Sequence, residues 1–192
     1  MDIKNLSSNK GNILSGVCII KPKVYQDNRG FFYESWNQKL FNKAIGEEVN
    51  FLQDNHSSSN IGVLRGLHYQ IAPKSQGKLV RCVSGAVFDV AVDIRKSSPT
   101  FGEWTSIVLD KVNKIMIWIP VGFAHGFLAI EENSEVLYKA SEFWSKEQDM
   151  SIRWDDKDIN INWPLKDINC FEPKLSKKDS KAPFLKNIEV LL

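Results

Sequence analysis

Between residues 51 and 144 the chain is a series of short apolar segments, each bounded by residues that favour turns. The stretch KLVRCVSGAVFDVAVDIR predicts two strands joined at Ser84-Gly85, and WTSIVLD and IMIWIP predict two further strands. Many short strands at regular spacing, with glycine and proline between them, indicate a β-sandwich or barrel and not a parallel α/β sheet. We therefore expect a mainly β protein.

One helix is predicted before this region. Asn37 can cap it, apolar residues at positions 40, 41, 44 and 45 form one face, and Gly46 can end it. After Trp144 the chain becomes polar and rich in turns, which predicts an irregular or partly helical tail. There is no internal repeat and no low-complexity linker, so we expect residues 1–192 to form a single domain.

Composition and charge exclude several classes of partner. The 43% of hydrophobic and 25% of charged residues are typical of a soluble protein, and a net charge of +2 argues against nucleic acid or an anionic membrane as a partner. The three cysteines form no CxxC motif, which favours free thiols in a reducing compartment. The amino end is polar, unlike a secretory signal, and the longest uncharged run, 115–130, is too short and too interrupted to span a bilayer. These features predict a cytoplasmic protein.

Charge is unevenly distributed along the chain. From Asn55 to Gly85 there is no acidic residue, whereas four basic residues occur: Arg65, Lys74, Lys78 and Arg81. A segment that is both basic and apolar suggests the positive wall of a cavity. A solvated basic edge strand explains the same pattern equally well.

The stretch VLRGLHYQ poses a geometric question. Arg65 and His68 are three positions apart, and a regular strand directs side chains at odd spacing to opposite faces. Either one of the two lies at the surface, or the strand bends at Gly66 and both side chains serve one pocket. A single histidine is more often a core or loop residue than a functional one.

Two histidines lie in a frame that resembles the two short motifs of cupins, which are small jelly-roll barrels. Gly62 precedes His68 by six positions, and His125 ends a PxGxxH motif. The second histidine and the glutamate of metal-binding cupins are missing, because HYQ replaces HxH and no acid follows it up to Lys78. We therefore expect no metal. Arginine and lysine in such a pocket suit an anion, and a histidine kept neutral among cations can act as a general base.

Several longer stretches resemble the dTDP-4-dehydrorhamnose 3,5-epimerase family. They include DNRGFFYESW (27–36), FLQDNHSSSNIGVLRGLHYQ (51–70), WIPVGFAHGF (118–127), LYKASEFW (137–144) and LSKKDSKAP (175–183). The resemblance runs from about Val17 to Leu185. It implies a cupin-like jelly-roll fold and an enzyme without a cofactor that inverts C3 and C5 of dTDP-4-keto-6-deoxyglucose. It also implies a homodimer in which the amino-terminal strands are exchanged.

The resemblance also implies a role for each matching residue. His68 would be the base that abstracts a proton, Asp179 the carboxylate that orients it, Lys78 the cation at the enolate oxygen, and Tyr138 the acid on the opposite face. The residues expected to hold the sugar nucleotide are Arg29, Glu34, Gln53, Asp54, Asn55, Arg65, His125, Trp144, Asp149 and Lys178. Without the resemblance, Tyr138 reads as an ordinary strand aromatic and His125 as a structural turn residue.

Two positions depart from the family pattern. Trp144 stands where a tyrosine is expected to stack on thymine, and Asp149 stands where a glutamate is expected near the nucleotide. Three alternative functions remain open. The first is a related enzyme that epimerises only C3 or isomerises the keto group, the second is a catalytically silent nucleotide-sugar binding module, and the third is a metal-dependent cupin dioxygenase.

Overall fold

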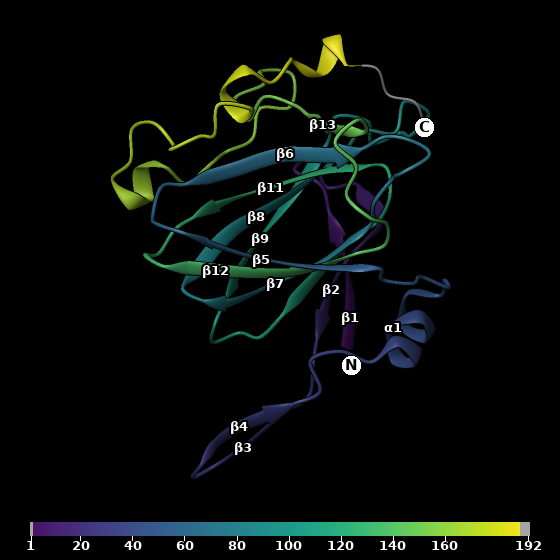
Figure 1. The fold of residues 1–192 in the computed structure, drawn as a ribbon, viewed down its shortest axis with the longest axis vertical. Helices are drawn as coiled ribbons and strands as arrows, with labels where there is room; N and C mark the ends of the chain where they lie inside the picture. Colours follow the sequence, from purple (N-terminus) through teal and green to yellow (C-terminus); the bar gives the residue numbers. More distant parts are fainter. Residues whose placement is uncertain (1, 189–192) are drawn as a thin grey trace.

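The computed structural model describes residues 2–188 and contains two antiparallel sheets packed face to face, with a separate two-stranded hairpin (Figure 1). The first sheet has the order β1 (Asp2–Ser7), β2 (Ile13–Lys21), β10 (Met116–Ile119), β7 (Lys78–Ser84), β12 (Ser134–Ala140), β5 (Gln53–Ser59). The second has the order β13 (Asp149–Ser151), β6 (Leu64–Gln70), β11 (Phe123–Ala129), β8 (Ala86–Asp93), β9 (Trp104–Asp110). The predicted mainly β jelly roll is confirmed as an open sandwich, because the two sheets do not close into a barrel.

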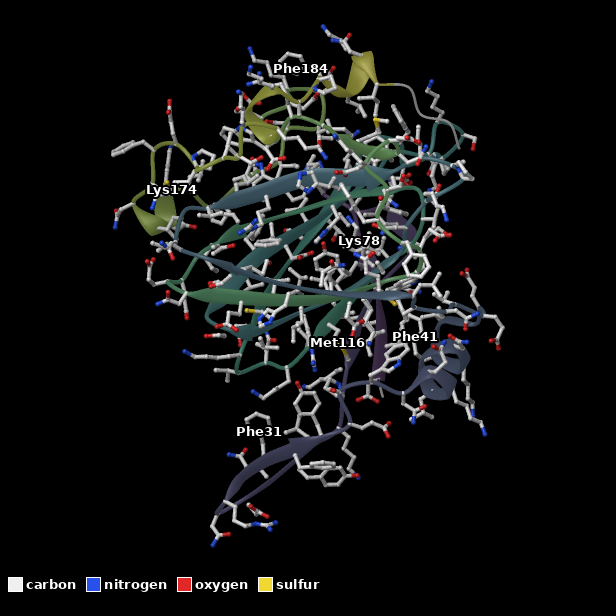
Figure 2. All side chains as sticks on the ribbon, in the orientation of Figure 1. Phe31, Phe41, Lys78, Met116, Lys174 and Phe184 are labelled. Atoms are coloured by element: carbon white, nitrogen blue, oxygen red, sulfur yellow. The ribbon has the colours of Figure 1, made fainter. Side chains whose placement is uncertain are left out.

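The core between the sheets follows from alternation along the strands. On β7, Val80 and Cys82 point inward, and on β8, Val87 and Ala91 meet them from the other sheet. Lys78 begins β7 on the same inward face, and its side chain lies between the two layers near the centre of the molecule (Figure 2). The space between the sheets is therefore apolar around Val80 and Cys82 and polar around Lys78.

The predicted boundary at Ser84-Gly85 is confirmed, and it marks a change of sheet. β7 ends at Ser84 in the first sheet and β8 begins at Ala86 in the second. Gly85 has a φ of +65°, and a Cβ there would lie 2.5 Å from the Ser134 hydroxyl oxygen. Glycine is therefore required where the chain passes from one layer to the other.

The predicted helix is also confirmed. In α1 (Gln38–Ile45), the Asn37 side chain accepts a hydrogen bond from the Leu40 N–H at 3.0 Å, and Gly46 ends the helix with a φ of +77°. Phe41 packs edge-on against Trp118 of β10, with ring centroids 5.3 Å apart. The helix thus covers the outer face of the first sheet.

The residue patterns did not locate the first four strands; only the family resemblance implied strands at the amino end. β3 (Val24–Asp27) and β4 (Gly30–Tyr33) form a hairpin that projects away from the sandwich (Figure 1). Phe31 and Phe32 on it are 58% and 72% exposed. Such a hairpin buries too little apolar surface of its own chain to be stable alone.

The tail crosses the outer face of the second sheet and contains three short 3₁₀ helices, η1 (Lys166–Ile168), η2 (Asp179–Lys181) and η3 (Leu185–Asn187). Leu185 and Ile159 pack against Val90 and Val92 on that face. The buried Asp156 carboxylate accepts the Leu185 N–H at 2.7 Å. This attachment brings the tail beside β6. Within residues 2–188 no helix is both long and apolar enough to cross a membrane.

Candidate active site

A β-bulge in β6 decides how Arg65 and His68 are directed. On the neighbouring strand β11, His125 pairs with His68 but Phe127 pairs with Arg65, so β6 has one extra residue in the interval. Gly66 lies in the bulge with a φ of +130°, and a Cβ there would lie 2.5 Å from the Gly126 Cα. Both side chains line the same cavity, so the second of the two alternatives, a bend at Gly66, is the correct one.

The cavity lies between the two sheets and beneath the tail, with a volume of about 470 Å³. All four residues predicted to be catalytic line it: His68, Lys78, Tyr138 and Asp179. Four residues predicted to bind the substrate line it as well: Arg65, His125, Asp149 and Lys178. The cavity-wall interpretation holds for two of the four basic residues, and the basic edge strand is not found, because β6 and β7 are interior strands of their sheets and Lys74 lies in the loop between them. Arg65 and Lys78 face the cavity, whereas Lys74 is paired with Glu142 near the surface.

His68 and Asp179 form a close pair although they are 111 positions apart. His68 Nε2 lies 2.6 Å from Asp179 Oδ1, and Asp179 is 3% exposed. Burial raises the pKa of Asp179, but the hydrogen bonds and charge of His68, with help from Ser176, outweigh burial and leave the pKa below its usual value. An ionised carboxylate only accepts hydrogen bonds, so a proton lies on Nε2, and in the neutral form of the ring Nδ1 is the basic nitrogen.

Lys78 is the cation at the centre of the cavity. Burial lowers the pKa of its ammonium group to about 8. The charges of Asp149 and Asp89 raise this pKa, and the charge of Lys178 lowers it further. Lys78 Nζ lies 3.4 Å from the backbone oxygen of His68. A protonated Lys78 is thus a point charge beside the histidine, available to a developing oxyanion.

Tyr138 approaches from the other sheet. It lies on β12, whereas His68 lies on β6, and both side chains line the cavity. Burial and the charge of Asp149 raise the pKa of Tyr138, an effect that Arg65 partly offsets. The phenol therefore keeps its proton at neutral pH and can donate it. A base on one wall and an acid on the opposite wall are the parts that inversion at carbon requires.

Comparison with known proteins agrees with this geometry. The family model described as dTDP-4-dehydrorhamnose 3,5-epimerase matches residues 12–187. The chain belongs to this family. A dTDP-4-dehydrorhamnose 3,5-epimerase of Shigella flexneri is 60% identical over 141 residues, which cover 73% of this chain and 78% of that protein.

Solved structures of epimerases share the fold. The dTDP-6-deoxy-D-glucose-3,5-epimerase of Legionella pneumophila, in complex with dTDP-4-keto-L-rhamnose, is 42% identical with a TM-score of 0.89 over 98% of this chain and 95% of that one. A 3′-monoepimerase of Streptomyces bikiniensis, in complex with dTDP-quinovose, is 33% identical with a TM-score of 0.82, covering 89% and 84%. The fold is therefore shared by 3,5-epimerases and by a 3′-monoepimerase.

Three of the predicted binding residues of this family member are held by neighbours on the cavity wall. Arg65 donates to the Ser59 hydroxyl from Nε and to the Ser58 backbone oxygen from Nη2, both at 3.0 Å. Asp149 accepts from Lys178 Nζ at 2.5 Å, which ties β13 to the tail. These contacts set the charged groups in place before any ligand binds.

The remaining predicted binding residues lie outside the cavity formed by one chain. Gln53 and Asn55 bond to each other at 2.9 Å, whereas Asp54 faces the opposite side and pairs with Lys139 at 2.9 Å. Trp144 is 55% exposed, and its backbone N–H donates to Gln53 Oε1. Arg29 is paired with Asp27 at 2.6 Å on the projecting hairpin, and Glu34 follows that hairpin.

Two charged residues near the cavity were missed from the sequence. Lys174 lines its rim, and Asp89 lies fully buried behind it, 2.8 Å from His125 Nε2. The signal for Asp89 was present, because the residue alternates in phase with the inward Val87 and Ala91. Among residues 2–188, no three His, Cys, Asp or Glu side chains gather where they could hold a metal ion.

Proposed function

We propose that this protein is a dTDP-4-dehydrorhamnose 3,5-epimerase. It inverts C3 and C5 of dTDP-4-keto-6-deoxyglucose and yields dTDP-4-keto-L-rhamnose. The single observation that carries the proposal is the opposition of His68, with its buried carboxylate, to Tyr138 across a cavity that also contains Lys78.

The chemistry follows from the C4 ketone, which acidifies the hydrogens on both neighbouring carbons. His68 Nδ1 takes a proton, the C4 oxygen becomes an enolate, and protonated Lys78 stabilises its charge. Tyr138 then returns a proton from the other face, so the carbon is inverted. His68 then releases its proton to solvent and the Tyr138 phenolate takes one up, and the same steps follow at the second carbon. The steps require no electron acceptor, because the substrate and the product are isomers.

The residues proposed to hold the nucleotide are divided between the cavity and the hairpin. Arg65 and Lys178 are proposed to pair with the negatively charged diphosphate of the ligand. Trp144 is proposed to stack on thymine. The two residues on or beside the hairpin, Arg29 and Glu34, cannot reach the cavity of their own chain as it is folded here. We propose a homodimer in which each hairpin supplies these residues to the partner. The proposed compartment is the cytoplasm, where the unpaired Cys18, Cys82 and Cys170 stay reduced.

The test is proton NMR of dTDP-4-keto-6-deoxyglucose with the purified, EDTA-treated protein in D₂O, with a reductase to trap the product. We expect deuterium at both C3 and C5 and formation of dTDP-rhamnose. Deuterium at C3 alone would identify a monoepimerase, as in the S. bikiniensis relative. No exchange at either carbon would contradict the proposal and leave a binding module.

A further inference from the structure

A second pair of histidine and carboxylate lies beside the first. His125 and His68 are directly opposite each other on neighbouring strands, and each has one ring nitrogen on a buried aspartate. His125 Nε2 lies 2.8 Å from Asp89 Oδ2, and the two residues are 7% and 0% exposed. The mechanism above uses the first pair; in the second, His125 is a predicted substrate-binding residue and Asp89 has no role assigned so far.

Asp89 is poorly satisfied for a fully buried carboxylate. Among residues 2–188 its Oδ1 has no hydrogen-bond partner. Asp93, equally buried on the same strand and face, accepts bonds from Arg95, Ser98 and Thr100. A buried carboxylate with a single partner is costly to keep, so it contributes little to stability and calls for another explanation.

The geometry fixes which nitrogen of His125 is free. A carboxylate accepts, so the proton of the 2.8 Å bond belongs to Nε2. Among residues 2–188 the only side-chain hydrogen bond of His125 is the one at Nε2; Nδ1 is not among the buried polar atoms left without a partner, so it is accessible, and the side chain lines the cavity. The basic nitrogen is therefore open to a ligand, and it can only accept a hydrogen bond.

We propose that Asp89 is a positioning residue: it fixes the His125 ring with its proton on Nε2, so that Nδ1 accepts a hydrogen bond from a hydroxyl group of the bound hexose. The inference rests on the proposed function for the identity of the ligand as a sugar nucleotide. A phosphate or a carbonyl oxygen has no proton to donate to Nδ1. The His125–Asp89 pair thus selects for a sugar hydroxyl, whereas the His68–Asp179 pair abstracts a proton.

Asp89→Asn tests the proton position directly. The chain has three histidines, so ¹⁵N-labelled imidazoles can be resolved and assigned by NMR. In the wild type we expect His125 to be protonated at Nε2 and not at Nδ1, with and without bound dTDP-glucose. In Asp89→Asn the amide can donate to Nε2 and move the proton to Nδ1. A proton on Nδ1 in the wild-type complex would overturn the inference.

Binding gives the functional readout. We expect Asp89→Asn to weaken the binding of dTDP-glucose by about tenfold, the effect of one lost hydrogen bond. The affinity for dTDP, which lacks the hexose, should be unchanged. The melting temperature of Asp89→Asn should not fall. Asp93→Asn is the matched control: it should lower the melting temperature and leave the affinity ratio of dTDP-glucose to dTDP unchanged. If Asp89→Asn instead unfolds the protein or weakens both ligands equally, its role is structural.

A double-mutant cycle shows whether Asp89 acts through His125. In His125→Asn an amide oxygen lies near the former position of Nδ1 and does not depend on Asp89. Adding Asp89→Asn in that background should cost no further affinity. An undiminished tenfold loss would overturn the inference. Turnover does not enter these measurements, so a wild type that binds dTDP-glucose better than dTDP without epimerising a substrate would contradict only the proposed function.

Discussion

At the residue scale, the site depends on which atom of each side chain carries a proton. His68 and Lys78 could be identified from the sequence as chemically capable groups, whereas Tyr138 was identified only through the family resemblance. Asp179 was paired with His68 only through the family resemblance, because a contact across 111 positions leaves no trace in a single sequence. Asp89 was missed because an acid in an alternating strand is ordinarily expected to face solvent.

Lys78 gives the site a characteristic pH dependence. Its protonated form is the one proposed to stabilise the enolate, and burial lowers its pKa to about 8. We expect kcat/KM to fall as the pH rises through about 8, well below the ordinary range of lysine. In Lys78→Arg, whose guanidinium stays charged, this fall should disappear from the pH profile. An unchanged fall in Lys78→Arg would assign it to another group.

The same shift affects stability, with a sign that can be worked out. The folded-state pKa is lowered from 10.5 to about 8, so between these values the unfolded chain binds more protons than the folded one. The Lys78 contribution to the free energy of unfolding therefore rises with pH across this window. Denaturant titrations at pH 8 and pH 10 should therefore show the unfolding free energy of the wild type increasing relative to that of Lys78→Met, because the other groups that titrate in this window are common to both proteins.

At the element scale, strands β7 to β10 and the helix were predictable, whereas the first four strands and the bulge were not. The limits of β7, β8, β9 and α1 follow from alternation, glycine positions and capping, which are local properties of the sequence. The bulge in β6 depends on the register against β11, which is a contact between distant segments. VLRGLHYQ therefore posed the question of the bend, and only the pairing answered it.

Gly66→Ala tests the requirement for the bulge. The new Cβ would lie 2.5 Å from the Gly126 Cα at a φ of +130°, so we expect a loss of more than about 2 kcal/mol of unfolding free energy, together with loss of activity. Gly11→Ala is the matched control, since its φ is +87° but no atom lies within 4 Å of the added Cβ. Gly11→Ala should lose only about 1 kcal/mol of unfolding free energy. Equal losses in denaturant titrations would show that the close approach to Gly126 has no effect.

At the scale of the whole molecule, the projecting hairpin is the feature that a single chain does not explain. Alternation could not locate its strands, because their apolar residues have no buried face within their own chain. Tyr25, Phe31 and Phe32 are each more than half exposed. An apolar surface of this kind marks an interface, and a second copy of the chain is the proposed partner.

Phe32→Asp tests the dimer. Phe32 is 72% exposed on β4, and burying a charge at an interface is costly, so we expect a monomer in sedimentation equilibrium and reduced kcat/KM. Phe171→Asp, at a tail residue that is 99% exposed, should leave both the mass and the activity unchanged. A Phe32→Asp dimer with full activity would place the interface elsewhere.

The central claim is that His68 and Tyr138 act on opposite faces of one substrate. Following deuterium uptake and inversion in parallel by NMR, for Tyr138→Phe and for His68→Asn, tests it most directly. In Tyr138→Phe we expect deuterium still to enter beside the ketone while inversion at that carbon is lost, because the base remains and the opposing acid is gone. In His68→Asn we expect neither exchange nor inversion. Inversion at wild-type rate in Tyr138→Phe, or exchange in His68→Asn, would contradict the account.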